Sequence, residues 1–307
     1  MSRAEEFQEL RPLLFSIAYR ILGSVSEAED AVQETWLRYA ASPTAPASAR
    51  SFLSAVVTRI SIDVLRSARV RREQYVGPWF PEPLLTDPYQ DPERSAELAD
   101  SVSTAALLLL ERLSPLERAV FVLREVFGFG FPEIASAVGR SQAACRQLAA
   151  RARRHMDEGR PRFEAGRRER AELAGRFFDA IRNGDVGGLQ ELLAADVQLV
   201  GDGGGKAPSL ARSVVGAAKV ARLLASFFAG LGRIDVTLEA REVNGQPGAI
   251  FRDRDRRVLS ILTLDVLDGQ IQMVRSVSNP DKLGHVGQVA DAWAVAREAS
   301  RARRTAD

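Results

Sequence analysis

Apolar residues recur every three to four positions along the first part of the chain, which is the period of an amphipathic helix. The segment FQELRPLLFSIAYRIL (7–22) places its apolar residues on one face, and segments 23–40 and 51–75 continue with the same period. We therefore expect three helices within residues 1–75, separated by a loop at 42–50. In the second helix, Ser26 followed by Glu29 has the spacing of a capping box.

Two segments interrupt this pattern. Residues 76–95 contain five prolines and cannot form a regular helix. The stretch EGRPRFEAGRRER (158–170) is rich in arginine and poor in apolar residues. Helical periodicity returns between them. The pattern predicts two helical domains, 1–75 and 105–160, joined by a linker over 76–104.

The period changes after residue 170. Two helices lead into a strand, another helix follows at 213–231, and apolar residues then alternate up to residue 278, with NGQPG and DGQ turns between the alternating runs. Helices followed by antiparallel strands predict an α+β domain with a curved sheet over 168–285. A weakly amphipathic tail, 286–307, ends the chain.

The segment 114–156 has the spacing of a helix-turn-helix. Ser114 and Glu117 form a capping box, a short helix starting at Pro132 ends at Gly139, and Ser141 caps a longer helix. Between residues 140 and 170, ten arginines stand against four acidic residues, a balance suited to a phosphate backbone. The alternative is a helical hairpin with a solvated basic face.

Charge is distributed unevenly over the first domain. The predicted second helix carries Glu27, Asp30 and Glu34 on one face. This acidic face suggests a protein partner, although acidic residues also stabilise a helix N-terminus without any partner. The third helix is basic, and basic elements in two domains suggest DNA held at two places. Its arginines include Arg59, Arg66, Arg69, Arg71 and Arg72.

Composition excludes several classes of protein. The 307 residues contain one cysteine, Cys145, and two histidines, which leaves no disulfide framework and little for a metal site. The sequence has neither an apolar signal core at the N-terminus nor an apolar run of the roughly 20 residues that a bilayer crossing needs. We expect a cytoplasmic protein without metal or cofactor.

The stretch DGGGK (202–206) combines glycines and a lysine as phosphate-binding loops do. A Walker loop brackets four residues between its glycines and follows the lysine with Ser or Thr, whereas this loop has three consecutive glycines and Ala207. Pro208 also prevents a helix from starting there to offer its dipole to a phosphate. Nucleotide binding is therefore not expected.

The first 160 residues resemble the extracytoplasmic-function group of bacterial sigma factors, through AYRILGSVSEAEDAVQETWLR, SFLSAVVTRISIDVLRSARVRREQY and the helix-turn-helix, in that order. The resemblance implies two all-α sigma domains that bind core RNA polymerase and promoter DNA. Loop 43–50 and the helix from Arg50 would hold an unpaired base of the minus-ten element, and the helix from Ser141 would read the minus-thirty-five element in the major groove. The residues implied at the beta-prime clamp helices are Asp30, Gln33, Glu34 and Trp36, and those implied at DNA are Arg59, Arg66, Arg69, Arg71, Ser141, Gln142, Arg146 and Gln147.

The C-terminal half resembles the SnoaL-like members of the cone-shaped α+β fold, which some sigma factors of this group carry as an extension. The motifs shared with that subfamily are WFPEP (79–83, with Phe80 where Leu is usual), DGGGK (202–206) and NPDKL (279–283). We hypothesise that this domain docks on the linker and so sets the orientation of the two DNA-binding domains. The residues expected at this contact are Trp79, Pro81, Glu82, Pro83, Asp202, Gly203, Gly204, Gly205, Lys206, Asn279, Pro280, Asp281, Lys282 and Leu283.

Other functions stay open on the sequence alone. A helix-turn-helix repressor would explain the basic elements but not the acidic helix. An isomerase or cyclase could use Asp202 or Asp265 as a base, and a Gly-rich hairpin without a partner is the alternative to docking. A small-molecule effector is a further candidate ligand of the third domain. We expect a monomer, with no catalytic residue and no membrane contact.

Overall fold

The computed structural model of the chain describes residues 2–43, 46–89, 91, 98, 100–159, 166–210 and 212–304, with a few side chains, among them 68–73, left outside that description. The chain forms two compact units. Unit 1 is Met1–Gln74 with Thr86–Pro161, and unit 2 is Tyr75–Leu85 with Arg162–Asp307. The segment Tyr75–Leu85, which the sequence places between two helical domains, therefore belongs to the compact unit of the C-terminal half.

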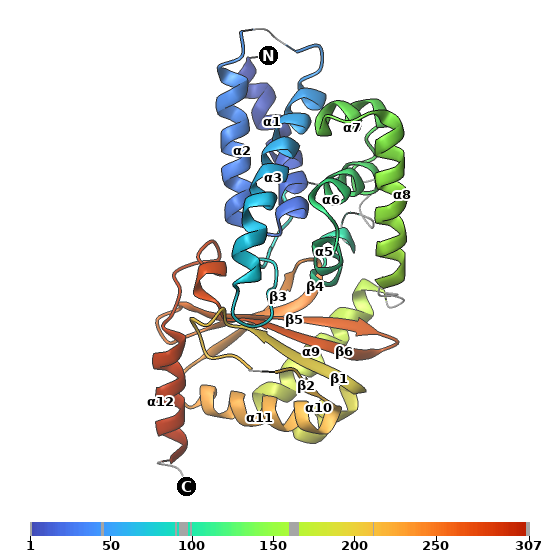
Figure 1. Cartoon of the computed structure of the whole chain (residues 1–307). Coiled ribbons are helices and arrows are strands. Elements are labelled where there is room, and N and C mark those ends of the chain that lie inside the picture. The colour runs from blue at the N-terminus through green and yellow to red at the C-terminus, as the bar shows by residue number, and fades with distance from the viewer. Residues whose placement is uncertain are drawn as a thin grey trace. The chain divides into compact units, whose positions relative to one another are not determined.

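Unit 1 is helical throughout its described regular structure, as the apolar periodicity predicts (Figure 1). Its elements are α1 (Arg3–Leu22), α2 (Val25–Ala40), α3 (Ala49–Glu73), α5 (Thr104–Glu111), α6 (Pro115–Phe121), a π-helical segment (Val122–Val126), α7 (Phe131–Val138) and α8 (Gln142–Gly159).

The helix ends follow capping chemistry, with one correction to the sequence analysis. Helix α2 is capped by Ser24, whose side-chain oxygen accepts a hydrogen bond from the Glu27 amide at 3.1 Å, whereas Ser26 lies inside the first turn. The predicted Ser26–Glu29 capping box is therefore wrong, because the extended backbone that a cap requires occurs two residues earlier. The Ser114–Glu117 capping box is confirmed.

The helix-turn-helix takes the predicted form. Helix α7 ends at Gly139, whose φ of 65° is the left-handed conformation that glycine adopts without strain. Ser141 then caps α8 by accepting a hydrogen bond from the Ala144 amide at 3.2 Å. The buried face of α8 includes Cys145 and Leu148, and it packs on α6 and α7.

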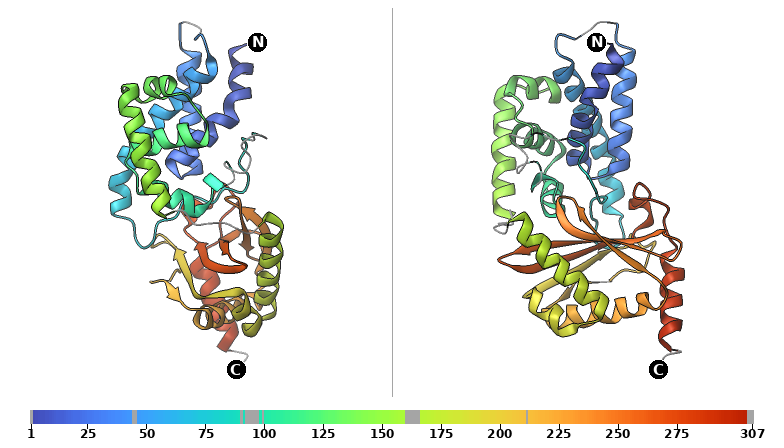
Figure 2. Two further views of the ribbon diagram at one scale, coloured as in Figure 1. Left: turned by 90° about the vertical axis from the view of Figure 1, so that its right-hand side faces the viewer. Right: turned by 180° about the vertical axis from the view of Figure 1, so that it is seen from behind.

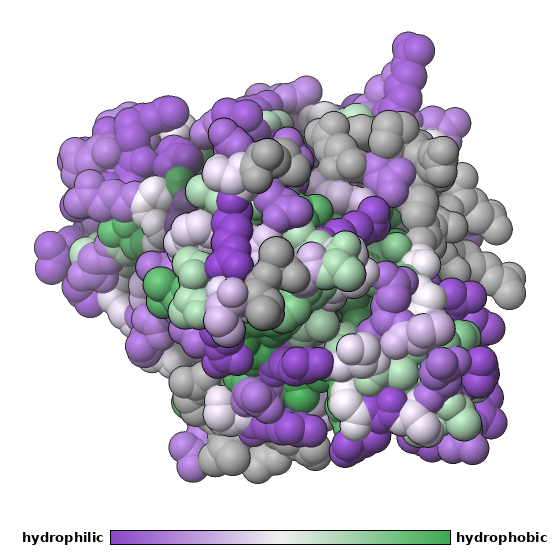
Figure 3. Space-filling model, turned by 90° about the horizontal axis from the view of Figure 1, so that it is seen from above, coloured by the Kyte–Doolittle hydropathy of each residue, from purple (hydrophilic) through white to green (hydrophobic). Residues whose placement is uncertain are grey.

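The three helices α1, α2 and α3 pack on one another around buried side chains such as Leu14, Ile17 and Val32. Figure 3 views the molecule from the end that carries the N-terminus in Figure 1. Hydrophilic side chains cover much of the surface seen in this view, with smaller groups of hydrophobic ones between them (Figure 3).

Unit 2 combines helices with one mixed sheet. Its elements are α9 (Arg167–Asn183), α10 (Val186–Leu192), β1 (Leu193–Asp202), β2 (Val214–Val215), α11 (Ala217–Gly232), β3 (Thr237–Val243), β4 (Gln246–Arg252), β5 (Val258–Leu267), β6 (Gln270–Val277), a 3-10 turn (Pro280–Lys282) and α12 (Ala292–Arg304).

The sheet has the strand order β2-β1-β6-β5-β4-β3. Strands β3 to β6 form the antiparallel meander that the alternating pattern predicts. Strand β1 joins this meander in parallel beside β6, so Asp202 at the end of β1 lies next to Val277 at the end of β6. Register shifts between Phe251 and Arg252 and between Asp265 and Val266 bend the strands and curve the sheet.

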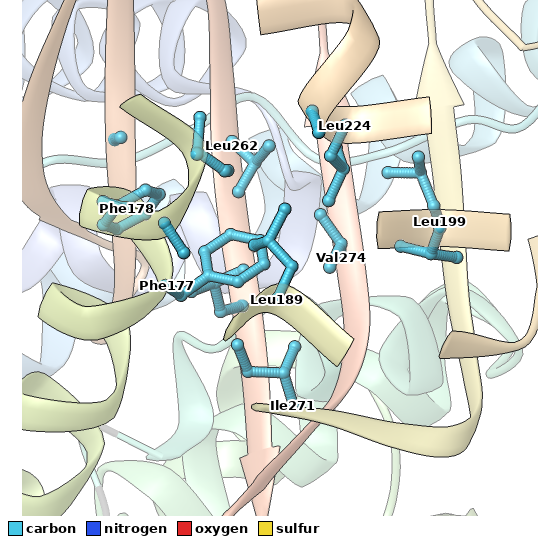
Figure 4. Close-up of a cluster of buried hydrophobic side chains, with 14 of the residues drawn as sticks. Phe177, Phe178, Leu189, Leu199, Leu224, Leu262, Ile271 and Val274 are labelled. Carbon is cyan, nitrogen blue, oxygen red and sulfur yellow. The ribbon is translucent and has the colours of Figure 1, made fainter. Parts of the chain in front are cut away.

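Helices α9, α10 and α11 cover one face of this sheet (Figures 1 and 2). Their apolar sides meet the inward residues of β1, β5 and β6, and Figure 4 shows Phe177, Leu189 and Leu224 directed toward Leu262 and Val274. Burial of these side chains is the main favourable term for folding of the unit. The sheet edge at which β1 and β6 both end is thereby held in place.

Candidate functional site

The strongest constellation of polar groups in unit 2 surrounds Asp202, the last residue of β1. Its side chain is fully buried. One carboxylate oxygen, Oδ2, accepts from the backbone amide of Phe80 at 2.8 Å and from Lys282 Nζ at 2.7 Å. The other, Oδ1, accepts from the Tyr75 hydroxyl. A buried carboxylate is tolerated only when its charge is paired and its oxygens accept hydrogen bonds, and Asp202 meets both conditions.

Lys282 supplies the opposite charge. It lies in the 3-10 turn that follows β6 and is also buried. Besides the contact with Asp202, Nζ donates to the Phe80 carbonyl oxygen. It lies 4.4 Å from the ring centroid of Trp79 and 4.6 Å from that of Tyr75, within the range of cation–π attraction. One ammonium group thus binds a carboxylate, a backbone carbonyl and two aromatic faces.

Tyr75 and Asn279 complete the group. Asn279 Nδ2 donates to the Tyr75 hydroxyl oxygen at 2.7 Å. Burial, and then the hydrogen bond to the Asp202 carboxylate, raises the pKa of Tyr75 well above its ordinary value. The hydroxyl therefore stays protonated and donates a hydrogen bond to Asp202 Oδ1. We call these five residues, Tyr75, Phe80, Asp202, Asn279 and Lys282, the Asp202 cluster.

The glycines of DGGGK allow the linker to approach. Gly204 and Gly205 have φ of 57° and 71°, in the left-handed region. A Cβ on Gly204 would lie 2.8 Å from the Tyr75 hydroxyl and would overlap the Asn279 amide, and one on Gly205 would lie 3.3 Å from Val76. The loop thus needs glycine both for its backbone conformation and for the space that Tyr75–Leu85 occupies.

A second set of contacts holds the far end of the segment. Two hydrogen bonds join Leu84 and Asn244. The backbone amide of Leu84 donates to the side-chain Oδ1 of Asn244 at 3.1 Å, and the backbone amide of Asn244 donates to the Leu84 carbonyl oxygen at 2.7 Å. His285 Nε2 lies 2.6 Å from the Pro83 carbonyl oxygen, and its Nδ1 lies 3.9 Å from the Glu82 carboxylate. Both ends of Tyr75–Leu85 are therefore bound to the C-terminal part of unit 2.

Some of the predicted contact residues lie at the bound segment and others do not. Asp202, Gly204, Gly205, Asn279, Lys282 and Trp79 meet in one place, and Pro81, Glu82 and Pro83 continue the bound segment. The ammonium group of Lys206 pairs with Asp281 across the exposed surface of the loop. Gly203 faces the Ala207 carbonyl within its own loop, Pro280 begins the 3-10 turn and Leu283 is buried at the end of it.

Tyr75, Asn244 and His285 are site residues that the sequence analysis missed. Tyr75 lies at the end of a helical stripe and Asn244 in an NG turn, so each has an ordinary structural explanation in the sequence. The signal that could have indicated Tyr75 is its position four residues before WFPEP, next to a motif already selected.

The four residues expected at the polymerase all belong to α2. Asp30 and Gln33 are exposed, and Glu34 is half-buried and pairs with Arg38 at 2.8 Å. The Trp36 ring packs against Phe7, with 5.1 Å between ring centroids. Trp36 therefore holds α2 against α1. Asp30 and Gln33 are the two residues of this group that are exposed on α2.

The residues expected at DNA fall in two groups. In α3, Arg59 donates to the backbone carbonyls of Ser136 and Ala137 at the end of α7, at 2.5 and 2.9 Å, and Arg66 pairs with Asp63. The side chains of Arg69 and Arg71 lie outside the described residues, as do residues 44 and 45 of the loop expected to hold a base.

In α8, Gln142, Arg146 and Gln147 are exposed along one face, and Ser141 is the cap residue. Arg146 lies over the Phe131 ring, 5.3 Å from its centroid, which orients the guanidinium. On the opposite face, burial raises the pKa of the Cys145 thiol, so this cysteine is a packing residue rather than a reactive thiolate.

The two carboxylates considered for acid–base catalysis are both engaged in ion pairs. Asp202 binds Lys282, and Asp265 pairs with Arg275 at 2.5 Å. Asp265 alternates along β5 with Leu264 and Val266 of the core, so it lies on the sheet face away from the helices. Neither arrangement resembles a general base directed into an apolar pocket.

No helix in the described part of the chain has the length and apolarity that a bilayer crossing requires.

Comparison with known proteins agrees with this architecture. The models of Sigma-70 region 2, Sigma-70 region 4 and the SnoaL-like domain match residues 7–71, 103–156 and 174–267. Together with the relatives below, these matches place the chain among the extracytoplasmic-function (ECF) RNA polymerase sigma factors that carry a C-terminal SnoaL-like domain.

Among its relatives is the ECF RNA polymerase sigma factor SigJ of Mycobacterium tuberculosis, 39% identical over 290 residues, which are 90% of this chain and 92% of the relative. The probable ECF sigma factor SigI of the same species is 32% identical over 89% of this chain and 92% of its own length. The crystal structure of M. tuberculosis SigJ aligns with a TM-score of 0.68 at 33% identity, covering 92% of this chain and 98% of that one.

Proposed function

We propose that this sigma factor controls its promoter selection through unit 2, which holds the linker segment Tyr75–Leu85 and thereby restricts how far apart region 2 and region 4 can bind DNA. Region 2 would contact the beta-prime clamp helices of core polymerase through the exposed side of α2 and melt the minus-ten element with α3. Region 4 would read the minus-thirty-five element with Gln142, Arg146 and Gln147 of α8.

The observation that carries this proposal is the buried Asp202–Lys282 pair, whose two members also bind the backbone amide and carbonyl of Phe80. Hydrogen bonds to backbone groups hold the segment regardless of its side chains, and the fixed segment loses the conformational freedom of a proline-rich linker. Because Tyr75–Leu85 is fixed on unit 2, fewer flexible residues remain between region 2 and region 4 to span the distance between the two promoter elements.

In vitro transcription with core polymerase, on a promoter of the gene's own operon, tests this function. The full chain and its Asp202→Asn variant would be compared on templates in which the spacing between the two elements changes one base pair at a time, which is roughly 3.4 Å of DNA per step. Asp281→Asn, which removes the exposed pair with Lys206 and keeps the hydrogen bonds of the Asp202 cluster, is the matched control.

The proposal expects the full chain and Asp281→Asn to prefer one spacing sharply and Asp202→Asn to accept a broader range. An identical spacing profile for all three chains would contradict control through the linker. The absence of any promoter-specific transcript from the full chain would contradict the assignment of promoter selection itself.

A further inference from the structure

A cleft of about 280 Å³ lies between helix α9 and the β3–β4 hairpin of unit 2, close to the lower end of the volumes of small-molecule sites, ~300–1,000 Å³. Most of its lining is uncharged. Ala171 and Ala174 line it from α9, and Phe178 adds an aromatic surface. Gly245 and Gly248 line it from the hairpin. Small side chains on both sides leave room for a compact, mainly apolar occupant.

Arg170 is the unusual member of the lining. It lies near the start of α9 and is half-buried, so an occupant of the cleft can reach its side chain. Its Nε and Nη1 atoms are covered by protein and have no hydrogen-bond partner. Within the described residues no ion pair involves Arg170, whereas its neighbour Arg168 pairs with Glu172 at 2.9 Å. The guanidinium has therefore lost part of its hydration without gaining an acceptor, which favours an anion beside it.

The other charges of the lining decide which anion fits. Arg241 is paired with Glu239 at 2.6 Å, and Glu242 places a negative charge at the cleft. A phosphomonoester carries close to two negative charges at pH 7, which Glu242 would repel and one guanidinium would not balance. A carboxylate carries one charge, and its two oxygens match the fork of N–H groups of a guanidinium. The cleft therefore favours a monocarboxylate with a short apolar body.

The cleft adjoins the turn that holds the far end of the linker segment. Gly245 lines the cleft, and the preceding residue, Asn244, is joined to Leu84 by two hydrogen bonds. Asn244 and Gly245 both have positive φ, 53° and 66°, and form the tight two-residue turn of the hairpin. An occupant packed between α9 and Gly245 would restrict the movement of this turn and so stabilise the contact with Leu84.

We propose that this cleft binds a small monocarboxylate with an apolar body, that the carboxylate pairs with Arg170, and that binding stabilises the turn that holds Leu84. Both parts concern unit 2 alone, so neither rests on the proposed control of promoter selection. By linkage, the factor by which binding stabilises the docked segment equals the factor by which docking raises ligand affinity.

The test uses the full chain and 4-fluorobenzoate, followed by the fluorine resonance of the probe, with the uncharged 4-fluorobenzamide as the matched probe. Arg170→Met removes the charge and keeps an unbranched side chain. Arg168→Met is the matched control on the same helix, at a side chain that is 92% exposed. We expect saturable binding of 4-fluorobenzoate to the unsubstituted chain and to Arg168→Met. Binding of the benzoate to Arg170→Met, and of the benzamide to the unsubstituted chain, should be at least about tenfold weaker.

A second variant tests the place of binding without touching the charge. Ala171→Leu, at an exposed position of α9 that lines the cleft, should fill part of the cleft and weaken binding of both probes. Absence of saturable binding to the unsubstituted chain, or equal affinity of Arg170→Met and Arg168→Met for the benzoate, would overturn the site. Unchanged binding to Ala171→Leu would overturn it as well.

The effect on the segment is read from hydrogen exchange of the Leu84 amide, with the amides of β5 as the reference. Saturating 4-fluorobenzoate should slow exchange at Leu84 at least about fivefold in the unsubstituted chain, and the same concentration should leave it unchanged in Arg170→Met. Saturation without slower exchange at Leu84 would overturn the stabilising effect. These titrations contain neither polymerase nor DNA, and the spacing experiment contains no probe, so failure here can be told apart from failure of the proposed function.

Discussion

Replacement of Lys282 by Met removes the positive charge from the Asp202 cluster while leaving a side chain of similar length. The fully buried Asp202 carboxylate would keep the Tyr75 hydroxyl and the Phe80 amide but lose its counter-charge. Removing one partner of a buried ion pair costs roughly 3–5 kcal/mol. When the segment leaves, the Asp202 carboxylate regains its contact with water. The substitution therefore makes docking of Tyr75–Leu85 less favourable, while the stability of the sheet is not affected.

The assay is hydrogen exchange of the backbone amides in the segment. The Phe80 amide donates to Asp202 and the Leu84 amide to Asn244, so both are protected only while the segment is docked. A loss of roughly 3–5 kcal/mol corresponds to exchange about two to four orders of magnitude faster, up to the rate of the free segment. The sheet amides of β5 serve as the reference within the same chain.

Two further variants make the reasoning refutable. Lys206→Met breaks a pair whose side chains are 56% and 59% exposed, so we expect a change below about 1 kcal/mol. The double variant Lys282→Met with Asp202→Asn leaves no uncompensated charge and should exchange more slowly than Lys282→Met alone. Unchanged protection in Lys282→Met, or equal effects of the two lysine substitutions, would refute the assignment of the buried pair as the clamp.

Further predictions concern the loop, the tyrosine and the two sigma domains. Gly204→Val should release the segment, seen as accelerated Phe80 exchange with β5 protection retained, because a branched side chain at φ 57° would meet Asn279 and Tyr75. Since the pKa of Tyr75 is raised on docking, docking should weaken as pH rises above about 10, where the released tyrosine ionises. Tyr75→Phe should reduce this pH dependence, measured on the Trp79 fluorine resonance of the chain labelled with 5-fluorotryptophan. Asp30→Arg should weaken binding to core polymerase at least about tenfold in a fluorescence-anisotropy titration, whereas Glu9→Arg, an exposed charge reversal on α1, should leave it unchanged. Gln147→Ala should cost roughly 1–3 kcal/mol of DNA binding and relax selectivity at one base of the minus-thirty-five element, measured on a panel of single-base variants.

Much of the fold follows from local sequence rules. Helical periodicity predicts α1 to α3, and the capping residue Ser114 with the turn glycine Gly139 predicts the helix-turn-helix. The alternating runs predict the antiparallel meander of β3 to β6. Each of these signals depends on residues a few positions apart, and such local preferences agree with the tertiary structure here.

Other features depend on residues far apart in the sequence. The parallel pairing of β1 with β6 joins Asp202 to Val277, and no local pattern specifies a partner across that separation. Tyr75 contacts Asp202 and Asn279 only because the segment folds onto unit 2. The DGGGK motif points to Lys206, yet Lys282 provides the charge that Asp202 binds, since the sheet edge brings the end of β6 beside the loop.

The membership of Tyr75–Leu85 in the C-terminal unit affects how shortened chains should be interpreted. A chain cut before α9 would lose the groups that cover Trp79, Phe80 and Leu84, and it would display these apolar side chains to solvent. If such a chain gave less transcript, two effects would be mixed in that result. The C-terminal domain would be absent, and the exposed apolar segment between the two sigma domains would be prone to misfolding and aggregation. Point substitutions within the full-length protein, such as Asp202→Asn, leave the apolar segment covered and test the proposed regulatory contact by itself.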